Sequence, residues 1–262
     1  MSSPHISAAR SPAGPMISVI GLYKSFGEKE VLRGVDLEIG RGESLMLVGG
    51  SGAGKSVFIK HLIGLLQPDE GHVVVDGVDL THASPEAVLE VRKRFGMTFQ
   101  EGALFDSMTV GDNIAFPIRR HTEKPEKEVA ARVRECLELV RLPGIEEKMP
   151  SELSGGMRRR VGFARAIALE PEILLFDEPT TGLDPINTAA IGAVIKQLRT
   201  ELGVTAVTIT PDIGLATKIA DRVAILRRGS ILMVDTPDRF LESDNWFVRA
   251  FINGEVPEED HP

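Results

Sequence analysis

The chain has 262 residues, of which 42% are hydrophobic and 26% are charged, and its formal net charge is −8 at pH 7. This length allows one large domain or two lobes, and the apolar content is sufficient for a sizeable core. The acidic balance argues against a general nucleic-acid binder, the single cysteine excludes an internal disulfide, and no apolar run approaches the roughly 18 residues that a membrane span requires.

Residues 1–15 are rich in Ser, Pro, Ala and Gly, so we predict a disordered lead-in there and no secretory signal. Residues 17–20 predict a first strand, and residues 31–39 predict a second, half-buried strand because apolar and polar residues alternate in it. The apolar segment 44–48 predicts a third strand, which leads directly into a glycine-rich loop.

The loop at 49–56 fits the phosphate-binding pattern G-x-x-x-x-G-K-S. Its residues are Gly49, Gly50, Ser51, Gly52, Ala53, Gly54, Lys55 and Ser56. Glycines let successive N–H groups turn toward anionic oxygens, and a helix predicted over 55–66 adds the positive end of its dipole. We expect Lys55 to reach the β- and γ-phosphates of a nucleotide and the Ser56 hydroxyl to hold Mg²⁺. A glycine-rich turn without a ligand is the alternative, and the complete motif with both correct flanks argues against it.

The middle of the chain is mostly helical by its pattern. Helices are predicted over residues 85–95, 124–142 and 151–169, whereas Gly102, Gly111 and Pro117 interrupt the pattern between 97 and 118. Cys136 falls inside the second of these helices and is expected to be a buried packing residue. Since strands and helices alternate on both sides of 85–169, we predict an α/β core with an inserted helical lobe.

The second chemical signal is the apolar strand 173–176, which ends in Asp177 and Glu178. A carboxylate at the end of a strand beside a phosphate loop can complete a Mg²⁺ shell, which suits Asp177. Glu178 points elsewhere and can polarise an attacking water. The alternative is a plain acidic turn, and the phosphate loop upstream argues against it.

Regular alternation continues to the C-terminal part. It predicts helices over 186–202 and 213–220, strands over 204–210 and 222–226, and a strand pair that turns at 228–229. The aromatic stripe within 240–253 is expected to pack on the core rather than to bind a partner, and 256–262 is acidic and expected to fray.

The third signal is a helix start at Ser154, which is followed by Gly155, Gly156 and Met157. Serine is a good N-cap, and the glycines leave backbone N–H groups open to an anion. One nucleotide does not obviously need two such helix starts from one chain.

With these three signals, residues 17–235 resemble the nucleotide-binding subunit of an ATP-binding cassette (ABC) transporter. The resemblance implies an ABC-type P-loop NTPase with a RecA-like α/β core, an antiparallel β subdomain and an inserted α-helical subdomain at approximately 85–169. It places the ATPase domain at 16–242, with 243–262 as a C-terminal helix and acidic tail. ATP and Mg²⁺ are the implied ligands.

The resemblance also implies a role for each matching residue. The loop 49–56 resembles Walker A, the strand 173–177 resembles Walker B, and Glu178 resembles the catalytic base. Gln100 resembles the Q-loop residue that senses Mg²⁺ and the γ-phosphate. Ser154, Gly155 and Gly156 resemble the signature motif, which in this family binds the γ-phosphate held by the partner subunit, and Asp184 resembles the D-loop residue at the dimer seam.

An aromatic residue stacks on adenine in this family. Phe26 lies at the matching position, and Tyr23 is the alternative if the register differs. A buried core aromatic is the other interpretation of Phe26.

The sequence departs from the family pattern at two positions. Met157 stands where the family usually has Gln, and Pro211 stands where the family has its switch histidine. Locally, Thr210 is expected to cap the next helix, with Pro211 in its first position. Since a γ-phosphate hydrogen bond is missing, we expect slow but real hydrolysis, and an ATP-binding subunit that barely turns over is the alternative.

Several details narrow the resemblance to the ATPases of MCE-associated (Mla-type) lipid transport systems. They include Met157, Val57 after the Walker serine, and the stretches 99–105 and 115–122. This implies a homodimer on the cytoplasmic face of the inner membrane, a permease that contacts the groove beside 100–108, an MCE-domain protein and often a STAS-domain protein. Membrane contact would run only through the permease. The Arg158–Arg160 run either shapes the field near the phosphates or is a solvated or acid-paired helix face.

The sequence leaves other classes of function open. An ABC importer for a polar solute is the nearest rival, and a non-catalytic regulatory subunit gains weight from Pro211 alone. A ribosome-acting ABC protein would carry two cassettes in one chain, and a chromosome-maintenance ATPase would carry a long coiled coil before the signature.

Overall fold

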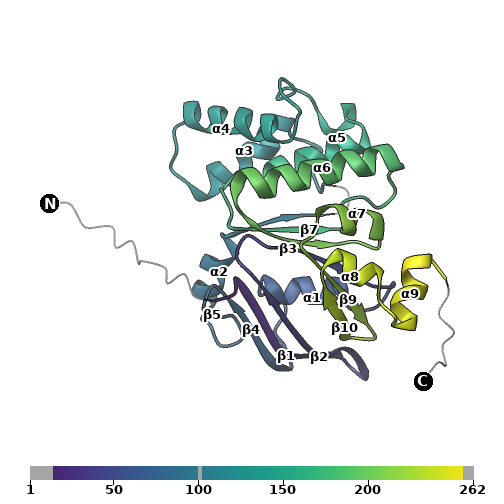
Figure 1. Cartoon of the computed structure of the whole chain (residues 1–262). Helices are drawn as coiled ribbons and strands as arrows, with labels where there is room; N and C mark the ends of the chain where they lie inside the picture. Colours follow the sequence, from purple (N-terminus) through teal and green to yellow (C-terminus); the bar gives the residue numbers. More distant parts are fainter. Residues whose placement is uncertain (1–13, 100–101, 256–262) are drawn as a thin grey trace.

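A computed structural model of the protein describes residues 14–99 and 102–255, in which helices pack against a larger and a smaller β-sheet (Figure 1). The strands are β1 (Ile17–Phe26), β2 (Lys29–Ile39), β3 (Ser44–Val48), β4 (Glu70–Val75), β5 (Val78–Asp79), β6 (Phe95–Thr98), β7 (Ile173–Asp177), β8 (Thr205–Ile209), β9 (Arg222–Arg227) and β10 (Ser230–Asp235). The helices are α1 (Lys55–Leu62), α2 (Pro85–Arg92), α3 (Val110–His121), α4 (Glu126–Leu139), the 3₁₀ turn Pro150–Glu152, α5 (Gly155–Ala166), α6 (Pro185–Leu202), α7 (Ile213–Ile219), α8 (Pro237–Leu241) and α9 (Trp246–Asn253).

The larger sheet has the strand order β10-β9-β3-β8-β7-β6. Its pairings are parallel except for β9 with β10, which form the hairpin that the sequence predicts. Every residue of β3 and β8 is buried, which explains why these strands read as nearly continuous apolar runs. The carboxyl ends of β3 and β7 therefore meet at one edge of the sheet, where the phosphate loop and the acidic pair begin.

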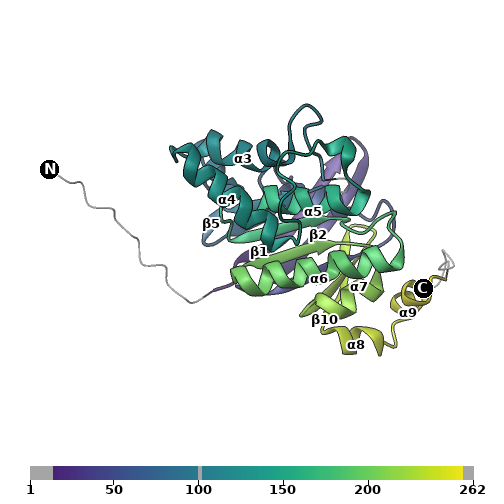
Figure 2. The same cartoon turned by 90° about the horizontal axis from the view of Figure 1, so that it is seen from above.

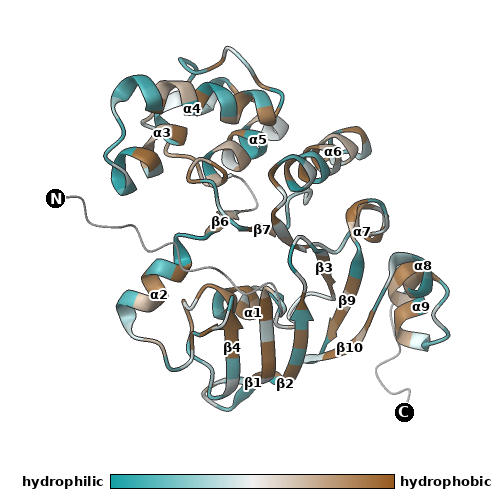
Figure 3. Cartoon of the chain, turned by 60° about the vertical axis from the view of Figure 1, so that its left-hand side comes forward, coloured by the Kyte–Doolittle hydropathy of each residue, from teal (hydrophilic) through white to brown (hydrophobic). Residues whose placement is uncertain are grey.

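Alternate residues of the central strands pack into two different hydrophobic cores. Met46 and Val48 pack into the layer made by α3 to α7, whereas Leu45 and Leu47 pack toward α1 and the smaller sheet. A strand with both faces covered can alternate in this way because successive side chains point to opposite faces. Figure 2 shows helices α3 to α6 over one side of the sheet, and Figure 3 shows the apolar residues of the strands that they cover.

The smaller sheet is antiparallel in the order β2-β1-β4-β5. Its inward residues alternate with exposed ones, as in the β2 residues Val35, Leu37 and Ile39, which are all buried. Helix α1 lies between the two sheets, since Phe58, Ile59 and Leu62 share a core with both. The predicted fold class, an α/β core with an antiparallel β subdomain and helices inserted between its strands, is confirmed.

The helix predicted over 85–95 is wrong at its C-terminal end, because α2 ends at Arg92 and residues Phe95–Thr98 form β6. This strand pairs with β7 at the edge of the large sheet, inside the segment assigned to the helical subdomain. A Cβ on Gly96 would lie 2.4 Å from the Ala166 carbonyl oxygen, so close approach to α5 requires glycine here. Tertiary pairing overrides the local helical pattern.

The interruption expected over 97–118 is also wrong in part, because α3 runs from Val110 to His121 and contains Gly111 and Pro117. Its N-cap, Thr109, accepts a hydrogen bond from the Asp112 N–H. Val110, Ile114 and Ile118 recur at helical spacing and are buried, so packing of one face compensates for the intrinsic cost of Gly and Pro.

Helix ends differ by a few residues elsewhere. Helix α1 ends at Leu62 rather than 66, because Gly64 adopts a left-handed conformation with φ 64°. Helix α5 begins at Gly155, after a 3₁₀ turn, rather than at 151. The expected packing of Cys136 is confirmed, since its side chain is buried within α4.

The aromatic stripe of the C-terminal segment packs on the core, as expected. Phe240 and Phe247 are buried, and Trp246 and Phe251 pack partly against the same cluster. The Arg227 guanidinium lies over the rings of Trp246 and Phe247, 4.7 Å and 4.2 Å from their centroids. Predictions for 1–13 and 256–262 lie outside the described residues.

Candidate functional site

The glycine-rich loop connects the end of β3 to the start of α1. Gly49 has φ 155°, and a Cβ there would lie 2.4 Å from the Leu226 carbonyl oxygen. Gly54 has φ 109°, and its Cβ would lie 3.0 Å from the Val31 carbonyl oxygen. Side chains are therefore excluded at both ends of the loop by neighbouring backbone, which leaves its interior open for a ligand.

Lys55 is buried and folds back over the loop. Its Nζ donates hydrogen bonds to the carbonyl oxygens of Gly49 at 2.7 Å and Gly50 at 3.0 Å. Burial lowers the pKa of the Lys55 amine, and the charges of Glu178 and Asp177 partly offset that effect. The ammonium is thus held at the mouth of the loop, where the sequence predicts that it meets phosphate.

A cavity of about 830 Å³ opens over the loop and brings together most of the predicted cis residues. It is lined by Phe26, Lys29, Val31, Gly49, Gly50, Ser51, Gly52, Gly54, Lys55, Ser56, Val57, Glu178, Pro211, Phe251, Gly254 and Glu255. Of the predicted residues, Ala53, which is buried beneath the loop, and Asp177 are not among them. The volume suits a nucleotide-sized ligand.

The acidic pair sits where β7 ends. Asp177 is the last strand residue, and burial raises the pKa of its carboxyl, with a further rise from Glu178 and an opposing effect from Lys55. The next residue, Glu178, has φ 48°, a left-handed conformation that non-glycine residues rarely adopt. This turn directs Glu178 into the cavity, while its N–H donates to the Ile209 carbonyl at 2.9 Å. Backbone strain at such a residue is typical of functional sites.

A neighbouring hydroxyl orients the Glu178 carboxylate. Thr181 Oγ1 donates to Glu178 Oε2 at 3.0 Å. This hydrogen bond holds Oε2 and does not involve Oε1, so Glu178 can accept a proton on the cavity side while one of its oxygens is fixed.

Phe26 lies at the end of β1 and lines the cavity. Its side chain is 49% exposed, so the interpretation of Phe26 as a buried core aromatic is wrong. The Lys24 Nζ lies 5.6 Å from the ring centroid. Tyr23, the alternative, does not line the cavity. An open aromatic face at this edge suits stacking on a purine.

The signature residues do not line this cavity. Ser154 caps α5 by accepting a hydrogen bond from the Met157 N–H at 3.3 Å, and Ser154 and Gly155 are exposed while Gly156 is half-buried. This helix start is capped, glycine-rich and outside the cavity, so any anion that it binds differs from one held by the phosphate loop of the same chain.

Two arginines of the Arg158–Arg160 run hydrogen-bond to backbone carbonyls of neighbouring segments, a role that neither interpretation from the sequence included. Arg159 is buried and donates to the Thr181 carbonyl, and Arg160 donates to the Val140 and Arg141 carbonyls at 3.5 Å and 3.3 Å. Arg158 is exposed. Two of the three arginines therefore fasten the start of α5 to neighbouring segments.

Asp184 is the N-cap of α6 and is exposed. Its carboxylate accepts from the Asn187 N–H at 3.0 Å and the Ile186 N–H at 2.9 Å. The Asn187 backbone and side chain, and then Ile186, lower the pKa of the Asp184 carboxyl. The charge is available at the surface, outside the cavity. Gln100 lies outside the described residues.

Pro211 lies at the cavity wall with Lys55 and Glu178, as the switch position predicts. The expected cap is wrong, however. Asp212 rather than Thr210 caps α7, by accepting from the Leu215 N–H at 3.0 Å, and Pro211 precedes the helix instead of starting it. Thr210 Oγ1 instead accepts from the Asp212 N–H at 3.0 Å, which fixes the turn around Pro211.

Six lining residues were not predicted as members of the site. They are Lys29, Val31, Val57, Phe251, Gly254 and Glu255. Lys29 and Val31 belong to β2, which has no nucleotide motif, Val57 directly follows the phosphate loop, and the other three come from the C-terminal segment almost 200 residues from that loop. The aromatic stripe in 240–253 was the only available signal, and it indicated packing alone.

Known proteins resemble this chain in sequence and in fold. A family model described as ABC transporter matches residues 32–181. A Mycobacterium leprae protein, "Probable ribonucleotide transport ATP-binding protein mkl", is 45% identical over 94% of this chain and 71% of its own length. A Haemophilus influenzae protein, "Intermembrane phospholipid transport system ATP-binding protein MlaF", is 40% identical over 92% of this chain and 91% of its own.

A solved structure shows the same fold with product bound. The dimeric post-hydrolysis state of the ATP-binding cassette MJ0796 with ADP and Pi superimposes with a TM-score of 0.77 at 30% identity. The match covers 85% of this chain and 99% of that one.

Proposed function

The chain belongs to the ABC transporter family, as an ATP-binding subunit with ABC-type ATPase chemistry, and from this premise we propose that it energises lipid transport in an MCE-type (Mla-like) system. The observation that carries the lipid assignment is the similarity to MlaF, which extends over 92% of this chain and 91% of that protein. Met157 and Val57, the details that narrow the resemblance, point to the same group.

The chain's residues divide the work on ATP. The open N–H groups of 49–54 and the Lys55 ammonium bind the phosphates, and Phe26 stacks on adenine. Glu178, held by Thr181, accepts a proton from the attacking water. Electrostatic stabilisation by such fixed donors supplies most of the rate in phosphoryl transfer.

The residues also fit a Mg²⁺ ion. The Ser56 hydroxyl lines the cavity, and the Asp177 carboxylate is close enough for its charge to act on Lys55. Both offer hard oxygen ligands of the kind that Mg²⁺ takes, and Gln100 is proposed as a third member of the shell. Bound there, Mg²⁺ would neutralise charge on the phosphate oxygens.

We propose that the working unit is a homodimer. Ser154, Gly155 and Gly156 lie outside the cavity of their own chain, so we assign them to the γ-phosphate of the partner's nucleotide. Asp184 would lie at the seam. ATP then favours the closed dimer because only that state contacts the phosphates from both sides, and hydrolysis reopens it.

The permease contact is assigned to a groove of about 400 Å³ beside 102–105. Phe99, Phe105 and Phe116 line it, and their side chains are 47%, 42% and 42% exposed. A hydrophobic patch on a helical subdomain suits docking of an amphipathic segment.

The family resemblance also supports a proposal about further partners and cellular location. We propose an MCE-domain carrier and a STAS-domain protein as further partners, and a peripheral position on the cytoplasmic face of the inner membrane. Within residues 14–99 and 102–255, none of the helices has the length and apolarity that crossing a bilayer demands. The proposed domains are 16–242 for the ATPase, with 85–169 as its helical subdomain, between the lead-in 1–15 and the C-terminal segment 243–262.

Affinity purification of the tagged protein from its native membrane tests the lipid assignment. We expect a permease and an MCE-domain protein in the eluate, with phospholipid or another lipid extractable from the complex in excess over a tagged, unrelated membrane ATPase. A complex that contains a soluble polar-solute binding protein and no MCE protein would replace this proposal with the importer alternative, which the name of the mkl relative favours.

Pro211 supports a second proposal, that turnover is slow. Its ring lines the cavity where a histidine would donate to the γ-phosphate, and proline carries no donor there. A subunit that binds ATP and barely hydrolyses it is the limiting case.

A further inference from the structure

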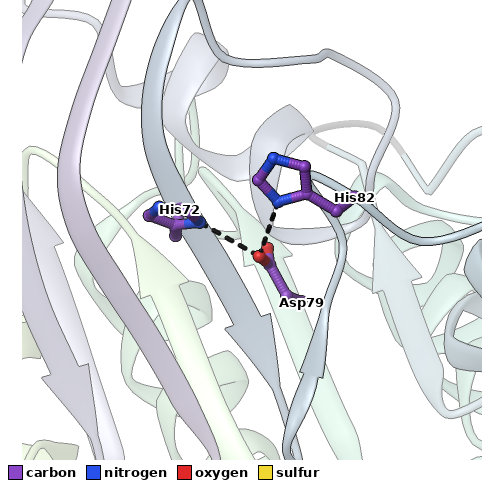
Figure 4. A group of neighbouring side chains, drawn as sticks. All are labelled: His72, Asp79 and His82. Carbon is purple, nitrogen blue, oxygen red and sulfur yellow. Dashed lines mark hydrogen bonds and ion pairs between the residues drawn. The ribbon is translucent and has the colours of Figure 1, made fainter.

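A cluster of two histidines and one aspartate lies on the smaller sheet, away from the nucleotide cavity (Figure 4). His72 belongs to β4, Asp79 ends β5, and His82 follows in the next turn, so eleven residues of chain supply all three side chains. None of them lines the nucleotide cavity.

Both imidazoles point to the same carboxylate oxygen. The Nδ1 atoms of His72 and His82 lie 3.0 Å and 2.9 Å from Asp79 Oδ2, and the three candidate ligand atoms lie within 4.8 Å of one another. A tetrahedral Zn²⁺ with bonds of about 2.0–2.2 Å places its ligand atoms about 3.3–3.6 Å apart. For the ion to enter, the two nitrogen–oxygen distances would lengthen by a few tenths of an ångström, and the two nitrogens, no more than 4.8 Å apart, would adopt the same tetrahedral spacing.

The hairpin holds the central carboxylate in place. The Thr81 N–H donates to Asp79 Oδ1 at 3.0 Å, which leaves Oδ2 facing the two imidazoles. Thr81 Oγ1 in turn accepts from the Val73 N–H at 3.2 Å, and the Leu80 N–H donates to the Val73 carbonyl at 2.8 Å. These bonds tie the turn back to β4, so ordering the ligands costs little further entropy.

The donor set selects the class of ion. Two imidazole nitrogens and a carboxylate oxygen suit Zn²⁺ and its neighbours in the first transition series, whereas Mg²⁺ and Ca²⁺ prefer oxygen alone. The side chains of His72 and His82 are 47% and 70% exposed, so a fourth position would remain open to water or to a ligand from another molecule.

We propose that His72, Asp79 and His82 form a three-ligand site for a divalent transition metal, with Zn²⁺ as its expected occupant. The ion would join β4, the edge strand β5 and the following turn, and thereby stiffen the sheet whose strand β1 carries Phe26 to the nucleotide cavity.

Calorimetric titration of the nucleotide-free full chain with ZnCl₂, in excess Mg²⁺ to compete at the nucleotide site, tests the proposal. We expect one Zn²⁺ per chain for the wild type and for His121→Gln, which changes an exposed histidine at the end of α3. The double variant His72→Gln/His82→Gln should bind at least about 100-fold more weakly, since even indirect ligand supports change metal affinity about 10–100-fold. Equal binding by wild type and double variant would overturn the proposal, as would loss of binding in His121→Gln.

A measurement on the wild type alone covers the case in which the double variant does not fold. Crystals soaked in ZnCl₂ should show an anomalous zinc peak within bonding distance of His72 Nδ1, His82 Nδ1 and Asp79 Oδ2. Zinc peaks elsewhere but not here would mean that the trio is a hydrogen-bonded surface cluster with no metal function.

Discussion

The replacement of Pro211 by histidine is predicted to raise the rate of ATP hydrolysis. Pro211 lines the same cavity as Lys55 and Glu178, and the Thr210–Asp212 hydrogen bond spans the turn around it and does not involve the proline ring. A hydrogen bond to a charged group contributes about 1.5–3 kcal/mol, and each 1.36 kcal/mol changes a rate tenfold. A bond formed mainly in the transition state would therefore raise kcat by about 10- to 150-fold.

The assay is steady-state ATPase activity of the purified protein with Mg²⁺, with Pro211→Ala as the matched control. The alanine variant removes the ring and supplies no donor, so it should keep the wild-type rate and lose at most about 1 kcal/mol of stability. A Pro211→His variant that is folded, binds ATP and hydrolyses it at the wild-type rate would refute the account of Pro211. Equal acceleration in both variants would assign the effect to the backbone instead.

Three further predictions follow from the contacts. Gly49→Ala should lower the free energy of unfolding by about 1–3 kcal/mol in urea denaturation and weaken ATP binding, because its Cβ meets the Leu226 carbonyl; unchanged values in both would contradict the close approach. Ser154→Ala should lower the free energy of unfolding by about 1 kcal/mol, because the helix cap is lost, and should abolish hydrolysis by the dimer while leaving ATP binding to the monomer intact. Full hydrolysis by this variant would show that Ser154 does not act in the site. Burial opposes ionisation of Asp76, but hydrogen bonds from Arg41 and Arg94 outweigh that effect and lower the pKa of its carboxyl below 3.8. The ionised carboxylate therefore stabilises the fold above that pH, and the stabilisation is lost as the pH falls. Asp76→Asn should flatten the decline of the unfolding free energy below about pH 4, and an unchanged slope would contradict this role.

The phosphate loop was predictable because its chemistry is local. Gly49 and Gly54 are required by backbone approach, Lys55 by charge, and the strand before and helix after by simple periodicity, so one window of sequence holds the whole argument. The acidic pair at Asp177 and Glu178 was predictable for the same reason.

Features that depend on distant partners were not predictable. Phe95–Thr98 becomes a strand because β7 offers an edge, and α3 forms across Gly111 and Pro117 because one face is buried. The helix was predicted over 213–220 and α7 does begin at Ile213, so the residue directly before it, Asp212, is the cap, and the expectation of a cap at Thr210 placed the helix start two residues too early.

Part of the cavity wall could not be predicted for the same reason. Phe251 and Glu255 line the cavity over the phosphate loop although they lie near the other end of the chain, and only the fold brings them there. Conversely, the separation of Ser154 from the cavity supports the interpretation that the resemblance gave, a role on the partner's nucleotide.

The most direct test of the central claim is ATP hydrolysis by the wild type and by Glu178→Gln, each alone and with the membrane partner. We predict that both bind ATP and that only the wild type hydrolyses it, slowly alone and faster in the complex. Equal rates for the two proteins in both settings, with ATP still bound, would contradict the assignment of Glu178 as the base and would make this chain a nucleotide-holding subunit rather than a working ATPase.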